Sequence, residues 1–198
     1  GDDETAFAVE QSLMDSNVSL INGLDAFLGT VNEAGDVRFS SGNIILGGGG
    51  SDIIEGRGGN DLIDGDRFID AKIKVTPTDI TKPAYFVSSM SEIHAKMFSG
   101  EIKPSELSIW REIKDGSVAG NVDVVEYTGN LADYTIEGFD ERTGIATDLD
   151  ADGWISITDT RAAAAVNDGV DLVTNVERVL FADGALKIAL HEIRMAAG

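Results

Sequence analysis

The sequence predicts a mainly β protein, in which a short parallel β-roll of nonapeptide repeats is joined to an antiparallel β module, with one or two short helices. Three observations predict this class. Glycine, acidic and aliphatic residues recur every nine positions between residues 38 and 70. Short apolar stretches between Asn/Asp-Gly turns fill the C-terminal part, as in antiparallel sheets. Signals for helix starts and stops are few.

These patterns divide the chain into four segments. A helix is expected in the first of them, from Thr5 to Met14, with the Thr5 hydroxyl as its N-terminal cap. The segments are an N-terminal lead segment (1–37), the nonapeptide β-roll (38–70), a connecting segment with a short helix (71–118) and a β module with a D-x-D-x-D-G loop (119–198).

Composition limits the classes of function. The 198 residues are 42% hydrophobic, which is enough to bury a core. The net charge of -20 argues against nucleic acid and anionic lipid as partners and favours cations. The chain has no cysteine, which excludes disulfides, thiol catalysis and the usual structural zinc sites. No apolar run reaches the ~18 residues of a membrane span.

The repeat is visible when the chain from residue 38 is written in nines. The units are RFSSGNIIL, GGGGSDIIE, GRGGNDLID and the incomplete GDRFID. The sixth positions are Asn43, Asp52, Asp61 and Asp70, and the eighth positions of the three full units are Ile45, Ile54 and Ile63. An oxygen ligand and an aliphatic side chain therefore recur together.

This spacing has a physical consequence for the fold. Each unit has a glycine-rich half that can turn tightly and an apolar half suited to a strand. If each unit is half of a coil, residues 18 apart become neighbours, so that Asn43 faces Asp61 and Asp52 faces Asp70. The aspartates would repel one another unless a cation lies between them. Ca²⁺ prefers six to eight oxygens at about 2.3 to 2.6 Å, and backbone carbonyls of the glycine loops would complete its shell. The glycines expected to contribute are Gly47, Gly49, Gly56, Gly58 and Gly65.

The repeat resembles the nonapeptide of RTX, or haemolysin-type calcium-binding, proteins, whose consensus is G-G-x-G-x-D followed by x-aliphatic-x. Residues 47–55 match it fully, whereas residues 56–64 carry Arg57 in place of the second glycine. The resemblance covers residues 38–70 and implies a parallel β-roll with one or two calcium ions in its loops. A flexible linker would not explain the nine-residue phase of the aliphatic side chains. A phosphate-binding loop would need G-x-x-x-x-G-K-[ST], which does not occur.

The connecting segment is the least acidic part of the chain. Ser89 and Glu92 form a capping box that opens a short helix ending at Gly100. A strand is expected around Leu107 to Trp110, leading to a turn at Asp115 and Gly116. His94 has no obvious partner and is expected to be structural. The residues expected on the buried face of the helix are Met90, Ile93, Met97 and Phe98.

The C-terminal segment predicts strands at 122–127, 134–139 and 154–158 and a hairpin around Ala182, Asp183 and Gly184. The phrases DVVEYTGNLADYTI and NDGVDLVTNVERVLFADG resemble a β module that follows RTX repeats in large bacterial proteins, including some haem peroxidases of the animal type.

A second candidate metal loop, DLDADGWISITD, spans residues 148–159. It resembles an EF-hand calcium loop over these twelve residues, but its flanks do not predict a helix pair, so a hairpin loop is expected. An ordinary Asp-Gly turn is the alternative. The implied ligands are Asp148, Asp150, Asp152, the carbonyl of Trp154 and Asp159.

The sequence therefore predicts a calcium-binding RTX module, without catalytic activity, that folds or is stabilised on binding extracellular calcium. It would be accessory to a larger protein that a bacterium secretes, with a type I secretion apparatus as a further partner. No nucleophile and base motif such as G-x-S-x-G or H-E-x-x-H is present. Two alternatives stay open, namely a calcium-stiffened adhesion or partner-binding module and a regulatory appendage of a secreted haem peroxidase.

Overall fold

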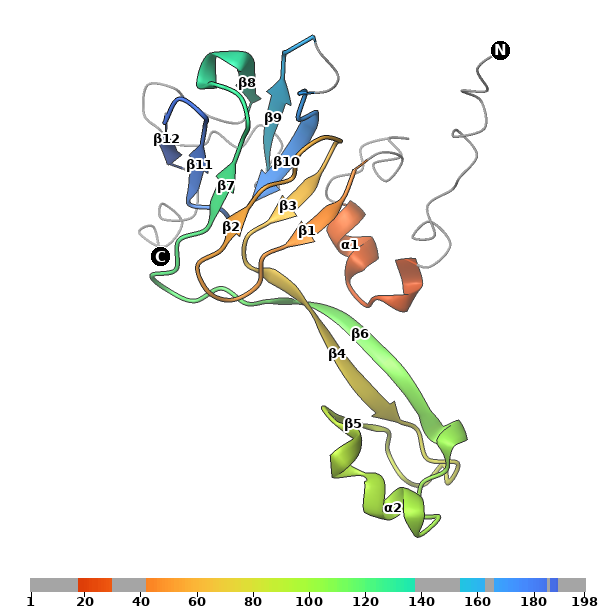
Figure 1. Cartoon of the computed structure of the whole chain (residues 1–198). Coiled ribbons are helices and arrows are strands. Elements are labelled where there is room, and N and C mark those ends of the chain that lie inside the picture. The colour runs from red at the N-terminus through yellow and green to blue at the C-terminus, as the bar shows by residue number, and fades with distance from the viewer. Residues whose placement is uncertain (1–17, 30–41, 138–153, 163–165, 185, 189–198) are drawn as a thin grey trace, which may run out of the picture.

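The computed structural model describes residues 18–29, 42–137, 154–162, 166–184 and 186–188. Within these ranges the protein is mainly β, as predicted, with few and short helices. It consists of a body of two sheets and a long arm that projects from the body (Figure 1). The helix expected at residues 5–14 lies outside the described residues.

The body contains two sets of parallel strands, one in each sheet. The first set is β1 (Ile44–Leu46), β3 (Leu62–Asp64) and β10 (Val170–Thr174), and the second is β2 (Ile53–Ile54), β7 (Val124–Glu126) and β11 (Arg178–Leu180). In chain order these six strands alternate between the two sheets. The chain therefore passes from one sheet to the other at each step, with longer excursions after β3 and after β7.

The register of the first pair agrees with the repeat. β1 and β3 are parallel, with Ile44 opposite Leu62 and Ile45 opposite Ile63, so residues 18 apart are neighbours. This spacing arises because each nine-residue unit carries the chain from one sheet to the other, and two units return it. After β3 the spacing ends, since the next strand of the second sheet, β7, begins only at Val124.

Antiparallel strands extend both sheets. β9 (Ile155–Asp159) pairs with β10 and with β8 (Tyr134–Glu137), which the 3₁₀ turn Leu131–Asp133 precedes. β12 (Leu186–Ile188) forms a hairpin with β11 across residues 182–184. The strands and the hairpin predicted in the C-terminal segment are confirmed within the described residues, although β7 is shorter than predicted.

The main core lies between the two sheets of the body. Ile54 and Ile63 are buried in it, and Ile45 packs against it half-buried, which confirms the interior position of the aliphatic residues of the repeat. A second cluster joins the body to the short helix α1 (Leu24–Gly29), which follows a 3₁₀ turn at Val18–Leu20. There the rings of Phe27 and Trp154 meet edge to face at 5.5 Å.

The arm is a long antiparallel hairpin with a helical tip (Figure 1). Its strands β4 (Arg67–Val75) and β6 (Leu107–Asp115) pair along their whole length, and β5 (Tyr85–Val87) pairs with β4. Strand β4 was not predicted, because its first residues were assigned to the last repeat unit, although the alternation AKIKV at residues 71–75 is typical of a strand. Since β4 begins at Arg67, the last residues of the predicted segment 38–70, including Asp70, lie in the arm.

The tip of the arm contains the predicted helix and its capping box. The 3₁₀ turn Met90–Glu92 and the helix α2 (His94–Phe98) follow Ser89, and Gly100 ends them with a positive φ. A further 3₁₀ turn, Pro104–Glu106, leads into β6. The predicted buried face is only half right. Ile93 is buried and Met97 packs against the arm core, but Met90 and Phe98 are exposed. Met90 lies in the 3₁₀ turn before α2, and Phe98, five residues after Ile93, lies on another face of the helix.

None of the helices in the described ranges is long and apolar enough to cross a membrane.

The body core predicts the effect of a truncation at Ile63. Its side chain is fully buried between the sheets, so Ile63→Ala removes packed methyl groups and leaves a cavity. We expect the free energy of unfolding, measured by urea titration, to fall by about 2–5 kcal/mol. The matched change Ile80→Ala, at a residue that is 96% exposed on the arm, should change it by less than about 0.5 kcal/mol. Equal effects of the two changes would contradict the assigned core.

Candidate metal centre

A row of hydrogen bonds connects equivalent residues of the first parallel set. Asn43, Asp61 and Asp171 precede residues of β1, β3 and β10 that are in register. The Asn43 N–H donates to Asp61 Oδ1 at 2.6 Å, and the Asp61 N–H donates to Asp171 Oδ1 at 2.9 Å. We call this row the first ladder. In it, each carboxylate holds the backbone of the neighbouring strand.

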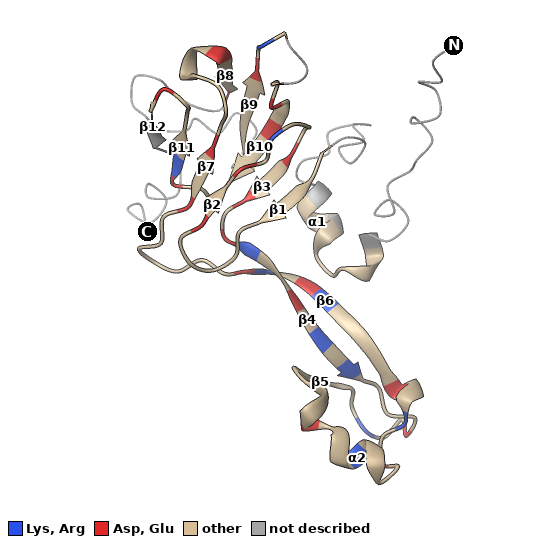
Figure 2. Ribbon diagram, in the orientation of Figure 1, with Lys and Arg blue, Asp and Glu red and all other residues tan. Residues whose placement is uncertain are grey.

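A second ladder joins the other parallel set in the same way. Asp52, Asp123 and Glu177 precede the in-register residues of β2, β7 and β11. The Asp52 N–H donates to Asp123 Oδ1 at 2.7 Å, and the Asp123 N–H donates to Glu177 Oε2 at 2.6 Å. The two sheets therefore have the same hydrogen bond, from a backbone N–H to a carboxylate, at corresponding positions. Acidic residues recur along their strands (Figure 2).

Three carboxylate oxygens of the ladders are buried without a hydrogen-bond partner. They are Oδ2 of Asp52, Asp61 and Asp123. Asp61 and Asp123 are each only 1% exposed, and one oxygen of each already accepts a backbone N–H. A buried anionic oxygen without a partner is costly, so the structure calls for a proton or a cation at these positions.

Each of these oxygens lies against a glycine. A Cβ built on Gly56 would lie 2.5 Å from Asp61 Oδ2, and one on Gly65 would lie 2.9 Å from Asp123 Oδ2. A Cβ on Gly47 would lie 3.3 Å from Asp52 Oδ2 and 2.5 Å from the carbonyl oxygen of Gly65. The glycines that begin the units at 47, 56 and 65 are therefore required, since any side chain would displace the carboxylate or the neighbouring loop.

The loops before the strands repeat their backbone conformation every nine residues. Gly50 and Gly59 have φ of 127° and 126°. Gly48 and Arg57 also lie nine apart, and both have positive φ, of 94° and 64°. Arg57, the departure from the repeat, therefore keeps the left-handed turn of a glycine at some cost in strain. The loop shape survives the substitution.

Burial raises the pKa of three ladder carboxylates, those of Asp61, Asp123 and Asp171. Burial raises the pKa of Asp61, and the N–H of Asn43 only partly offsets it. Burial also raises the pKa of Asp123, and the carboxylates of Glu177, Asp52 and Asp64 add to the effect. The pKa of Asp171 is raised to about 7, mainly by burial. A divalent cation beside these groups would reverse the effect by favouring their charged forms.

Most residues predicted to bind calcium in the repeat lie along the two edges where the loops stack. Asn43, Gly56 and Asp61 lie on one edge, and Gly47, Asp52 and Gly65 lie on the other. The remaining loop glycines contact neighbouring loops. A Cβ on Gly49 would lie 3.0 Å from the carbonyl oxygen of Gly116, and one on Gly58 would lie 3.4 Å from that of Asn167.

Asp70 is not part of this arrangement. It lies in β4 and forms ion pairs with Lys72 at 2.8 Å and Lys114 at 2.9 Å, and these lower its pKa. The prediction that Asp70 faces Asp52 is wrong, because the chain enters β4 at Arg67 and Asp70 lies opposite Glu112 of β6. Asp123, 71 residues after Asp52, takes that place.

Sequence reasoning missed the ladder residues beyond the arm. Asp123, Asp171 and Glu177 each precede a buried valine by two positions, as Asp52 precedes Ile54. This acid-x-aliphatic spacing is the signal that could have found them. The segments inserted between the strands hid this signal, since the glycine-rich half of the unit is absent or distant in sequence.

Among the described residues, no three His, Cys, Asp or Glu side chains are grouped to hold a metal, so backbone carbonyls would have to complete any coordination shell.

The second predicted loop is described only in part. Asp148, Asp150 and Asp152 lie outside the described residues, so their role stays a prediction. Trp154 is buried against Phe27. Asp159 pairs with Arg161, with 2.5 Å between Oδ2 and Nη2, and accepts the N–H of Asp168 at 2.6 Å. Both contacts give Asp159 a structural role.

Arg161 organises a buried polar cluster around this pair. Its guanidinium also contacts Asp168 at 3.1 Å and the hydroxyl of Tyr134 at 2.9 Å, and that hydroxyl donates to Asp168. Burial acts to raise the pKa of Asp159, but hydrogen bonds from Arg161 and the Asp168 N–H lower it overall. Burial and the bond to Asp168 raise the pKa of Tyr134 to about 12. The cluster is satisfied internally, which indicates a structural function.

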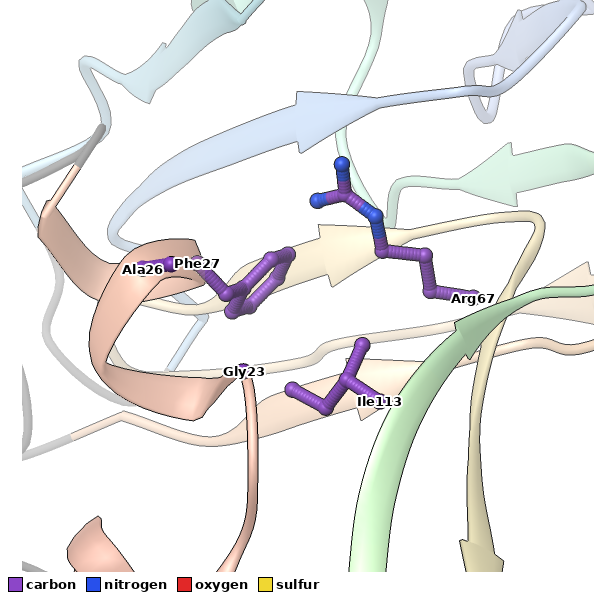
Figure 3. A pocket seen from close by; sticks show the side chains of 5 residues that line it. All are labelled: Gly23, Ala26, Phe27, Arg67 and Ile113. Atoms are coloured by element: carbon purple, nitrogen blue, oxygen red, sulfur yellow. The ribbon is translucent and has the colours of Figure 1, made fainter.

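A small cavity lies between α1 and the base of the arm (Figure 3). Its volume is about 220 Å³, and Gly23, Ala26, Phe27, Arg67 and Ile113 line it. The Arg67 guanidinium lies 5.1 Å from the centre of the Phe27 ring and 3.4 Å from an oxygen of Asp64. Because its one charged group is already paired, the cavity offers little to a charged ligand.

Comparison of the chain with protein-family models, with curated proteins and with solved structures gives no match.

The contact between Gly56 and Asp61 yields a direct test of the glycine requirement. In Gly56→Ala the methyl group would displace the Asp61 carboxylate, and we expect the free energy of unfolding to fall by about 1–3 kcal/mol. Gly58→Ala is the matched control, because its methyl group would make only an ordinary contact. Thermal melts of both variants would measure the difference, and an Ala at 56 as harmless as one at 58 would refute the packing described.

The polar cluster predicts that Arg161 is needed for stability. Arg161→Met leaves the buried carboxylates of Asp159 and Asp168 without their cation. We expect a loss of up to about 3 kcal/mol in urea unfolding. The control is Arg57→Met, which removes an exposed guanidinium paired with Glu55 at 3.5 Å and should cost less than about 1 kcal/mol. A stable Arg161→Met variant would show that the cluster is held by other contacts.

Proposed function

We propose that this chain is a calcium-binding module whose body is closed by Ca²⁺ held between neighbouring coils. One observation carries the proposal. Three buried carboxylate oxygens have no partner, and each lies against a glycine that leaves room for it. Carboxylate and carbonyl oxygens are the hard ligands that Ca²⁺ prefers, and the loops beside the ladders contain both.

On this proposal the residues that hold calcium are those of the repeat and its loops. Asp61 and Asp52 would supply carboxylate oxygens, and carbonyl groups of the loops beginning at Gly47, Gly56 and Gly65 would complete the shell. Bound calcium would neutralise charges that now face one another across the strands. The ion would supply the attraction that the acidic chain lacks.

We further propose that the alternation of the six strands is a short RTX-type β-roll, interrupted by the arm and by β8 and β9. The 18-residue register of β1 and β3 supports this interpretation, as do the ladders and the interior position of Ile54 and Ile63. The module would be non-catalytic and accessory to a larger bacterial protein, loose while calcium is scarce and closed after secretion into a calcium-rich medium.

The position of the carboxylates favours calcium-dependent folding over a calcium-stiffened adhesion surface. Asp61 and Asp123 lie inside the body between strands and not on an open face. An ion at these positions would stabilise the fold and would not be presented to a partner. Each site would contribute ~2.7 kcal/mol when free calcium is a hundred times its Kd.

The proposal is tested by removing the charge of Asp61 and measuring the Tm with and without calcium. In wild type, Ca²⁺ should raise the Tm relative to excess chelator. Asp61→Asn removes a buried, unpaired charge, so in chelator it should be at least as stable as wild type. In calcium it should gain clearly less in Tm, because a ligand is lost.

Asp79→Asn is the control, since it removes the same charge from an exposed position on the arm and should respond to calcium like wild type. Magnesium at the same concentration controls for ionic strength. A wild-type melt that is the same in calcium and in chelator would overturn the proposal.

A further inference from the structure

The arm interrupts a repeat unit, and the structure joins the two halves again. Gly65 begins a unit before the arm, and Asp123 occupies the acidic position after it. A Cβ on Gly65 would lie 2.9 Å from Asp123 Oδ2, much as one on Gly56 would lie 2.5 Å from Asp61 Oδ2. Residues separated by the whole arm therefore reproduce the contact that the intact unit makes over five residues.

The strand pairing supports this equivalence. β7 is parallel to β2, with Ile53 opposite Val124, just as β3 is parallel to β1. Asp123 Oδ1 accepts the Asp52 N–H at 2.7 Å, as Asp61 Oδ1 accepts that of Asn43 at 2.6 Å. Asp123 thus completes the interrupted unit in backbone position, in hydrogen bonding and in its glycine contact.

Two of the three oxygens without partners belong to Asp52 and Asp123, which precede the paired strands β2 and β7. Asp52 Oδ2 and Asp123 Oδ2 are buried without a hydrogen bond, and Asp123 is 1% exposed. Gly47, which lies against Asp52 Oδ2, also packs against the carbonyl oxygen of Gly65. Carboxylate and carbonyl oxygens are therefore gathered where the arm begins and ends.

The charged side chains described near Asp52 and Asp123 do not neutralise these two carboxylates. The carboxylates of Glu177, Asp52 and Asp64 surround Asp123 and, with burial, raise its pKa. Asp64 is itself satisfied by the side chains of Arg67 and Asn175. No lysine or arginine in the described part of the chain forms an ion pair with Asp52 or Asp123.

We propose that Asp52 and Asp123 bind a divalent cation of the Ca²⁺ type at the base of the arm, distinct from the ion at Asp61, and that this cation joins the two ends of the arm. The inference rests on the proposed function and extends it to residues on both sides of the insertion. Since Gly65 lies just before β4 and Asp123 follows β6, the ion fixes where the arm leaves the body.

The experiment counts calcium ions by titration calorimetry on the full chain. Wild type, Asp61→Asn, Asp123→Asn and Asp52→Asn are compared, with Asp79→Asn as the control. We expect Asp123→Asn and Asp52→Asn each to lose one equivalent of Ca²⁺, or to bind it about tenfold more weakly or worse. Asp61→Asn should lose a different equivalent, so that the double variant Asp61→Asn with Asp52→Asn loses both. Asp52→Asn serves if the Asp123 variant fails to fold, because Asp52 is less buried.

Hydrogen exchange locates the second ion. In wild type, calcium should slow exchange at residues 65–67 and 116–123, and in Asp52→Asn this protection should be lost while that at residues 56–61 remains. If wild type takes up no calcium, the proposed function fails as well. If only Asp61→Asn loses an ion and both arm-base variants bind like wild type, the proposed function stands and the arm-base site is refuted.

Discussion

One recurring interaction holds the parallel strands together: a carboxylate accepts the backbone N–H of the equivalent residue beside the neighbouring strand. Asp61 does this for Asn43 and Asp123 does it for Asp52. The bond brings the carboxylate inside, where its second oxygen finds no partner. Glycine is then required opposite that oxygen, because a Cβ would collide with it. The spacing of glycine, acid and aliphatic residue in the repeat follows from this single contact.

The arm shows how a body built from repeats tolerates a long insertion. β4 and β6 pair from Arg67 opposite Asp115 to Val75 opposite Leu107, so the insertion brings its own ends together. It also has its own core, which includes Val75, Val87 and Ile93. Contacts within the arm therefore offset the entropy cost of closing this long insertion. Strand β7 can then pair with β2 as if the intervening residues were absent. The arm, residues 67–115, holds 8 of the 15 basic residues and 7 of the 35 acidic ones, so the acidic excess of the chain lies outside it.

Burying carboxylates in the body costs free energy, and hydrophobic packing alone does not offset this cost. Ile54, Ile63 and the neighbouring valines fill the space between the sheets, but the ladders keep several carboxylates beside them. Elsewhere in the molecule a buried acid is matched by a cation of the chain, as Asp159 and Asp168 are by Arg161. The ladder acids Asp61, Asp123 and Asp171 have raised pKa values instead of such a partner. Asp159 and Asp168 therefore belong to a structural ion-pair cluster, whereas the ladder acids form the candidate metal centre.

Four features could be predicted from the sequence: the mainly β class, the 18-residue register of β1 and β3, the interior aliphatic residues and the capped helix at Ser89. These features are local, because a nine-residue period and a capping box act within one or two turns of chain. The sequence did not predict that Asp70 belongs to the arm or that Asp123, Asp171 and Glu177 continue the ladders. Their positions depend on strand pairing between segments far apart in the chain, where the glycine half of the unit no longer adjoins its acid. Hydrogen-bond register across a sheet, and not sequence spacing, chooses those partners.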